Sequence, residues 1–95
     1  MFLHVEQAKY IQDYQIEIQF NDGRTGVADL KNALNGGIFK LLKDVDTFKK
    51  FRVDVELATI TWANGADLAP EYLYFEAFKN APELQEKFKT WGYVA

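Results

Sequence analysis

Residues 60–71 read Ile60-Thr61-Trp62-Ala63-Asn64-Gly65-Ala66-Asp67-Leu68-Ala69-Pro70-Glu71, and they combine a strand end, a tight turn and a helix-entry signal in twelve positions. Ile60 and Trp62 lie two positions apart, so they predict the end of a strand with one buried face. Asn64 and Gly65 follow, and this pair favours a tight turn because both residue types tolerate positive φ. We expect the Asp67 carboxylate to help to close that turn by bonding to the backbone.

Two helices are predicted after this turn. Pro70 suits the first position of a helix, where its missing N–H costs nothing. Residues 70–79 are apolar on almost every side, which predicts a helix buried on more than one face, by its own core or by a partner. Asn80 predicts the cap of a last helix over residues 81–90, and Gly92 predicts its end.

The clearest strand lies earlier in the chain, where apolar and polar residues alternate strictly over residues 14–20. Asp22 and Gly23 then favour a two-residue hairpin loop, followed by a second strand over residues 24–28. Such a loop predicts two cross-strand pairs on the apolar face, Ile18 opposite Val27 and Phe20 opposite Thr25.

The remaining segments are shorter. Residues 2–10 indicate an extended segment that breaks at Asp13. Asp29 predicts the cap of a short helix that ends at residues 35–37, and residues 38–45 predict a second helical turn that stops at Asp46 or Thr47. Alternation over residues 51–57 predicts another half-buried strand.

The two turns resemble each other in sequence. Phe20-Asn21-Asp22-Gly23 and Trp62-Ala63-Asn64-Gly65 each join an aromatic strand end to an Asx-Gly pair. An Asp-Leu pair follows each turn, but at a different spacing. We therefore interpret the similarity as a recurrent local solution and not as a duplication.

The composition indicates one α+β domain over residues 1–95, with antiparallel β-hairpins, short helices and a C-terminal helix. The 95 residues include 48% hydrophobic and 16% aromatic residues, which is ample material for a core of this size. The aromatic surplus also leaves open a homodimer, in which some rings would lie in an interface.

Several kinds of chemistry are excluded or unsupported. The chain has no Cys and no Ser, and its single histidine is His4. We predict no catalytic residue and no cofactor, since the chain lacks the Cys and Ser nucleophiles of common catalytic sites. We also predict no metal, because His4 has no second histidine at ligand spacing. The start of the chain has no basic region followed by an apolar run, so we predict no signal peptide, no membrane segment and a cytoplasmic location.

Charge is distributed unevenly along the chain. Residues 31–52 carry six basic and two acidic side chains, although the whole chain has a net charge of −3. Such a segment suits an acidic partner or a phosphate backbone, but it is more often a solvated face. The candidate nucleic-acid contacts in it are Lys40, Lys43, Lys49, Lys50 and Arg52.

Aromatic residues offer a second candidate surface, because such side chains anchor protein interfaces. The candidates are Trp62, Tyr72, Tyr74, Phe78 and Trp91. The competing interpretation, which the sequence favours, is a core cluster beneath the Asn64-Gly65 turn. Trp91 is the better candidate for an exposed anchor.

Two segments, residues 18–42 and 48–74, together resemble the family catalogued as domain of unknown function 2442, found in small bacterial proteins. The shared motifs include Ile18-Gln19-Phe20-Asn21-Asp22-Gly23 and the stretch from Ile60 to Tyr74. The resemblance covers about residues 1–75 and leaves a C-terminal helical extension over about 76–95. It implies an α+β fold with antiparallel strands, but no activity. Some relatives carry the domain ahead of a DNA-binding helix-turn-helix, and others sit beside a second small protein as in toxin–antitoxin pairs.

The leading hypothesis is a non-enzymatic protein-interaction module with an antitoxin-like or regulatory role and an unknown protein partner. The alternative is a nucleic-acid-associated accessory domain that uses the basic residues 40–52. An enzyme would need a pocket with converging carboxylates.

Overall fold

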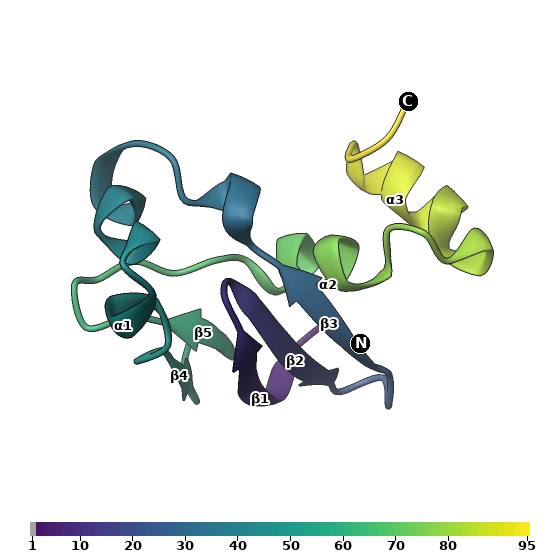
Figure 1. Cartoon of the computed structure of the whole chain (residues 1–95). Coiled ribbons are helices and arrows are strands. Elements are labelled where there is room, and N and C mark those ends of the chain that lie inside the picture. The colour runs from purple at the N-terminus through teal and green to yellow at the C-terminus, as the bar shows by residue number, and fades with distance from the viewer. Residues whose placement is uncertain (1) are drawn as a thin grey trace.

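The computed structural model describes residues 2–95 and confirms the expected α+β class, with two antiparallel sheets and short helices (Figure 1). One sheet has the order β1-β2-β3, and β4 pairs with β5 in the other. In chain order the elements are β1 (Val5–Gln12), β2 (Gln15–Phe20), β3 (Thr25–Asp29), η1 (Lys31–Ala33), η2 (Gly37–Lys43), α1 (Val45–Phe48), β4 (Arg52–Asp54), β5 (Thr59–Thr61), α2 (Pro70–Phe78), η3 (Pro82–Leu84) and α3 (Gln85–Trp91). The η elements are 3₁₀-helices.

Strand β2 lies at the centre of the larger sheet and confirms the strand predicted over residues 14–20. Ile16, Ile18 and Phe20 are fully buried, and Glu17 between them is exposed. The two sheets meet where the Val5 N–H of β1 donates a hydrogen bond to a carbonyl oxygen at the end of the β4–β5 turn. Because buried and exposed side chains alternate along β2, the core lies on one face of this strand and the other face meets solvent.

The predicted register of the β2–β3 hairpin is wrong by one residue, because its loop has three residues and not two. Ile18 lies opposite Gly26 and not opposite Val27. The Phe20 N–H donates to Arg24 O at 2.9 Å, and the φ of Gly23 is +88°. A one-residue shift moves every side chain to the other face. Val27 therefore faces solvent beside Glu17, and the same shift separates Phe20 from Thr25.

The second loop has the same geometry as the first. The Trp62 N–H donates to Ala66 O at 2.9 Å, and the Gly65 N–H donates to Trp62 O at 3.0 Å. Asp67 does not close this turn as predicted, because the side chain that does so is Asn64, whose Oδ1 accepts from the Ala66 N–H at 3.0 Å. Asp67 instead pairs with Thr61 through an isolated β-bridge. The sequence similarity of the two loops therefore reflects one shared backbone solution.

Two acidic residues open helical segments. Asp29 Oδ1 accepts from the Lys31 N–H at 3.0 Å, but the N-cap is Leu30 and not Asp29 as predicted, and a single 3₁₀ turn follows in place of the predicted short helix. Asp44 caps α1 by accepting from the Asp46 N–H at 3.3 Å and from the Thr47 hydroxyl. The prediction that helical structure stops at Asp46 or Thr47 is therefore wrong, because the Asp44 cap starts a new helix there.

The strand predicted over residues 51–57 is also shorter than expected, since β4 ends at Asp54. The Asp54 carboxylate accepts from the Leu57 N–H at 2.9 Å and closes a turn that ends with Ala58 at φ +56°. Val55 and Leu57 are 92% and 56% exposed. Their alternation with polar residues therefore does not reflect a buried strand face.

Helix α2 begins at Pro70 as predicted, and the chain's own core covers it. Its inner side lies against β3, where Gly26 lets the Phe78 ring approach the strand closely. On its outer side, Phe75 packs edge-on against Phe88 of α3 at 5.1 Å and stacks with Tyr93 at 5.0 Å between ring centroids. These contacts explain why residues 70–79 are apolar on almost every side.

The last helical segment differs from its prediction at one end only. Its N-terminal cap is Ala81, and Asn80 makes no capping hydrogen bond. The Gln85 side-chain amide donates to the carbonyl oxygens of Lys79 and Ala81, and so ties the start of α3 to the end of α2. The end at Gly92, with φ +86°, is as predicted.

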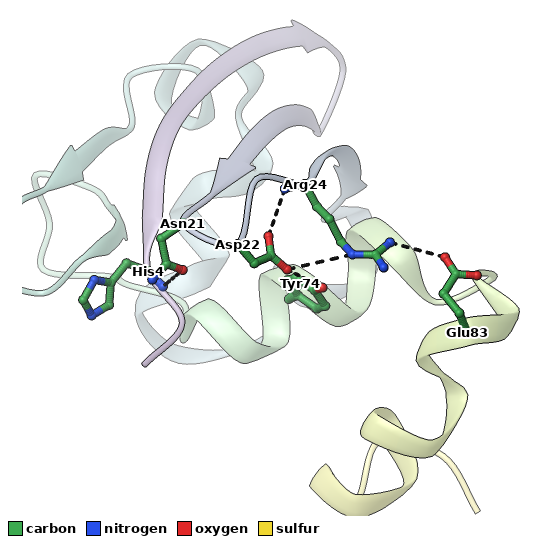
Figure 2. A network of polar contacts seen from close by, with 6 residues as sticks. All are labelled: His4, Asn21, Asp22, Arg24, Tyr74 and Glu83. Carbon is green, nitrogen blue, oxygen red and sulfur yellow. Dashed lines mark hydrogen bonds and ion pairs between the residues drawn. The ribbon is translucent and has the colours of Figure 1, made fainter. Parts of the chain in front are cut away.

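A polar network joins the first loop to the C-terminal helices (Figure 2). The Tyr74 hydroxyl of α2 donates to Asp22 Oδ2 at 2.7 Å, and the Arg24 N–H donates to Asp22 Oδ1 at 2.9 Å. The Arg24 guanidinium also reaches Glu83 Oε1 of η3 at 3.3 Å.

Within residues 2–95, no helix has both the length and the apolar character needed to cross a membrane.

Candidate interaction surface

The 3₁₀-helix η2 presents three different rows of side chains, because residues three apart lie above one another in such a helix. Phe39 and Leu42 form the inner row, with Leu42 fully buried. The second row is apolar but faces outward, since Ile38 is 43% exposed and Leu41 is 66% exposed. The third row is basic and exposed and consists of Lys40 and Lys43.

Contacts at both ends hold η2 in place. The Asn64 side-chain amide donates to Ile38 O at 3.0 Å, so the second loop lies directly beside the apolar row. At the other end, the Tyr14 hydroxyl donates to Lys43 O. Helix η2 also packs against α1. Three separate parts of the chain therefore position the rows.

A pocket of about 190 Å³ lies beside the second loop. Trp62 lines it, although this side chain is only 4% exposed and its Nε1–H donates to Phe48 O at 2.8 Å. The other residues that line the pocket are Thr47, Lys50, Ala63 and Asn64. Asn64 thus joins the pocket to the apolar row of η2.

The basic residues near this surface differ in their partners. Within residues 2–95, Lys40, Lys43 and Lys50 make no ion pair, whereas Lys49 Nζ lies 3.2 Å from Asp46 Oδ1. The exposed Arg52 lies on β4 opposite Thr61. Four of the five predicted cations therefore lack an ion pair within the described residues, and three of these four, Lys40, Lys43 and Lys50, lie on η2 or line the pocket.

We call the surface made by Ile38, Leu41, Lys40, Lys43 and the Trp62 pocket with Lys50 the η2 surface. It combines exposed apolar side chains with unpaired positive charge in a chain that is acidic overall. Two exposed apolar residues in one row indicate a binding face more strongly than a scattered pair does.

The five aromatic candidates do not form one exposed surface. Trp62 and Tyr74 are 4% and 1% exposed and belong to the core, which is the interpretation that the sequence favoured. Tyr72, Phe78 and Trp91 are half-buried and pack against that core. Trp91 contacts the Tyr74 ring at 5.9 Å between centroids, so it is a covered side chain more than an exposed anchor.

Ile38 and Leu41 were not among the candidate site residues. Their pattern predicted a helical turn with one apolar stripe that also contained the buried Phe39 and Leu42. A period of three residues places Ile38 with Leu41 on one row and Phe39 with Leu42 on another, and this period distinguishes a 3₁₀-helix from an α-helix.

Two acidic side chains that could in principle take part in chemistry have structural roles instead. Asp44 caps α1, and Asp54 closes the β4–β5 turn. His4 is exposed, and its backbone N–H donates to Asn21 Oδ1 at 2.8 Å (Figure 2). In the part of the chain from residue 2 onward, no three His, Asp or Glu side chains are grouped so that they could hold a metal ion.

The fold is that of a small α+β domain with two antiparallel sheets, short helices, and two loops that share one backbone geometry. The chain belongs to the family described as protein of unknown function (DUF2442), whose model matches residues 5–79. The match ends one residue after α2, so η3 and α3 lie outside it. A search of curated proteins found no match, and a search of solved structures also found none.

Proposed function

We propose that this chain is a non-enzymatic protein-interaction module, with a regulatory or antitoxin-like role, that binds an acidic segment of a partner protein through the η2 surface. The observation that carries the proposal is the exposure of Ile38 and Leu41 beside unpaired lysines. Covering a side chain such as Leu41 would contribute on the order of 1 kcal/mol from apolar area alone.

The two kinds of row have different roles in the proposed complex. Leu41 and Ile38 supply apolar contact, and the Trp62 pocket accepts an apolar side chain of the partner. Lys40 and Lys43 lie at the edge of this contact, where exposed charges mainly speed association and select the partner by sign. An acidic segment with one apolar anchor side chain satisfies both rows.

The test compares two leucines of similar exposure. Tagged wild-type chain, Leu41→Asp and the control Leu57→Asp are used to recover proteins from native cell extract, with and without nuclease, and bound proteins are identified by mass spectrometry. Leu57 lies in the β4–β5 turn and is not part of the η2 surface. We expect a stoichiometric partner that survives nuclease and is lost only with Leu41→Asp. Equal recovery by all three chains would contradict the proposal.

Charge reversal is a second test of the same surface. Once a partner is known, Lys43→Glu should slow its association and reduce the dependence of the rate on salt, with little change in dissociation. The paired Lys49 gives a matched control, because Asp46 already offsets its charge. If Lys49→Glu has the larger effect, the basic row of η2 is not the part that meets the partner.

A nucleic-acid-associated role remains the second candidate, because four of its predicted contacts, Lys40, Lys43, Lys50 and Arg52, have no ion-pair partner within residues 2–95. It predicts binding of labelled DNA or RNA that weakens steeply with added salt. Fluorescence anisotropy with duplex and single-stranded probes tests it. No binding at low ionic strength would remove this candidate. Binding that Lys40→Glu weakens and Leu41→Asp leaves intact would favour it over the protein partner.

A further inference from the structure

Strand β3 forms a free edge of the larger sheet. The sheet order is β1-β2-β3, and the opposite edge, β1, is joined to the smaller sheet through Val5. Strand β3 has five residues, contains no Lys and no Pro, and pairs with β2 without a bulge. Lys, Pro and bulges are the usual features that keep an edge strand from pairing with another chain.

The hydrogen bonds that flank β3 show which of its backbone groups point outward. The Phe20 N–H donates to Arg24 O, and the Leu30 N–H donates to Tyr14 O, both at 2.9 Å. In an antiparallel ladder, alternate residues of a strand bond to the same neighbour. The even-numbered residues therefore bond to β2, and the odd-numbered residues direct their N–H and C=O groups to the free edge. These residues are Thr25, Val27 and Asp29.

The same three residues have exposed side chains on the solvent face of the sheet. Val27 is 43% exposed, although it is the only large apolar residue in the strand. Within residues 2–95, no hydrogen bond outside the sheet reaches the backbone of Thr25, Val27 or Asp29. Helix α2 lies on the other face, below Gly26, so it does not cover the row that contains Val27.

We propose that β3 pairs in antiparallel fashion with β3 of a second copy of this chain, about a two-fold axis at Val27. This register places Val27 opposite its own copy, so each exposed side chain covers the other. Thr25 then lies opposite Asp29 of the second copy, which gives a hydroxyl and a carboxylate and avoids two like charges in one pair. The edge is therefore complementary to itself in both hydrogen bonding and charge.

The pairing would join two three-stranded sheets into one continuous sheet. A contact between strands of five residues is smaller than the roughly 1,600 Å² of a standard stable interface. The dimer is therefore weak and forms in a concentration-dependent way. It is also separate from the η2 surface, so Leu41→Asp should leave it unchanged.

The absence of cysteine makes a direct test simple. Antiparallel residues that exchange hydrogen bonds have Cα atoms about 5.5 Å apart, a distance that suits a disulfide. Under mild oxidation we expect Val27→Cys to form a covalent dimer at least tenfold faster than Val55→Cys, which is 92% exposed in the β4–β5 turn. Equal rates would overturn the proposal.

Two further single-cysteine variants test the register. Thr25→Cys and Asp29→Cys should each cross-link slowly alone and quickly when mixed, because each residue lies opposite the other across the two-fold axis. Fast cross-linking of each variant with itself, and no gain on mixing, would rule out this antiparallel register.

Sedimentation velocity over a range of concentrations tests the untreated chain. We expect wild type to shift from monomer to dimer, and Val27→Lys to remain a monomer with an unchanged urea midpoint. Because Val27 is exposed, this change should not disturb the fold. A wild-type chain that stays monomeric at every concentration would overturn the proposal, as would a β3 edge that pairs only with a different protein.

Discussion

The hydroxyl of Tyr74 donates a hydrogen bond of 2.7 Å to the carboxylate of Asp22, joining helix α2 to the loop between β2 and β3. The Tyr74 ring is 1% exposed and lies 5.0 Å from Phe20 and 4.7 Å from Phe78 between centroids. Lys87 Nζ of α3 lies 5.5 Å from its centre. One side chain therefore contacts the sheet, its own helix and the C-terminal extension.

Removing this hydroxyl should weaken the whole domain. We expect Tyr74→Phe to lower the free energy of unfolding by about 1–2 kcal/mol, because a hydrogen bond to a charged acceptor is lost and the ring packing is kept. Urea unfolding measures the change. Tyr10→Phe is the control, since the half-buried Tyr10 hydroxyl makes no hydrogen bond within residues 2–95. A cost equal to that of the control would contradict a stabilising role for the contact.

The domain should lose stability at high pH. Burial, followed by the charge of Glu76, raises the pKa of Tyr72 to about 12, and burial, followed by the hydrogen bond to Asp22, raises the pKa of Tyr74 to about 12. An unfolded tyrosine has a pKa of about 10. The folded state thus holds these protons more tightly, so the stability they contribute is full below about pH 10 and is lost as pH rises towards about 12.

The measurement for this prediction is the free energy of unfolding at about pH 9 and at about pH 11. The double variant Tyr72→Phe with Tyr74→Phe should lose less stability between these values than wild type. Every other ionisable group is present in both chains, so the difference between the chains isolates the two tyrosines. Identical losses would show that their ionisation is not linked to folding.

Adding one methyl group at Gly26 should be costly. A Cβ there would lie 2.6 Å from Phe78 Cε1, and Phe20 and Tyr74 confine that ring. We expect Gly26→Ala to lower the free energy of unfolding by about 1–3 kcal/mol. Combining it with Phe78→Leu, which removes the clashing ring atoms, should recover part of the cost in a double-mutant cycle. Simple additivity would show that the two sites do not touch.

The two equivalent loops should respond equally to substitution. Gly23 and Gly65 have φ values of +88° and +91°, and an added Cβ meets nothing within 4 Å at the first and only an ordinary contact at the second. Gly23→Ala and Gly65→Ala should each cost about 1–2 kcal/mol, since an L-residue is strained at positive φ. Asparagine tolerates this region better, so Gly23→Asn should cost less. A large cost at one loop alone would show that they differ.

The sequence predicted those structural features that depend only on residues close together in the chain. The strand over residues 14–20, the turn signals at Gly23 and Gly65 and the helix start at Pro70 all follow from chemistry within a few positions. The loop length could not be read in the same way, because two- and three-residue loops both use an Asx-Gly pair. The observed register places Gly26 beneath Phe78, a residue more than fifty positions away.

The candidate site was predicted only in part. The basic residues of η2 were identified correctly as exposed, because charged side chains rarely lie fully inside a protein. For apolar residues the sequence favours burial without saying what covers them. Leu42 and Leu41 are adjacent and chemically identical, yet one is fully buried and the other is 66% exposed.

The α+β class and the chemistry of the two loops could be predicted from the chain alone, because they depend on periodicity and on residues that tolerate positive φ, and the shared motifs identified the family. The folded structure was needed to show that Val27 faces solvent at a free edge and that Leu41 is left uncovered, and it confirmed that Trp62 and Tyr74 lie in the core. The physical reason is that burial is a property of pairs of surfaces. Whether an apolar side chain meets protein or water depends on elements that are distant along the chain.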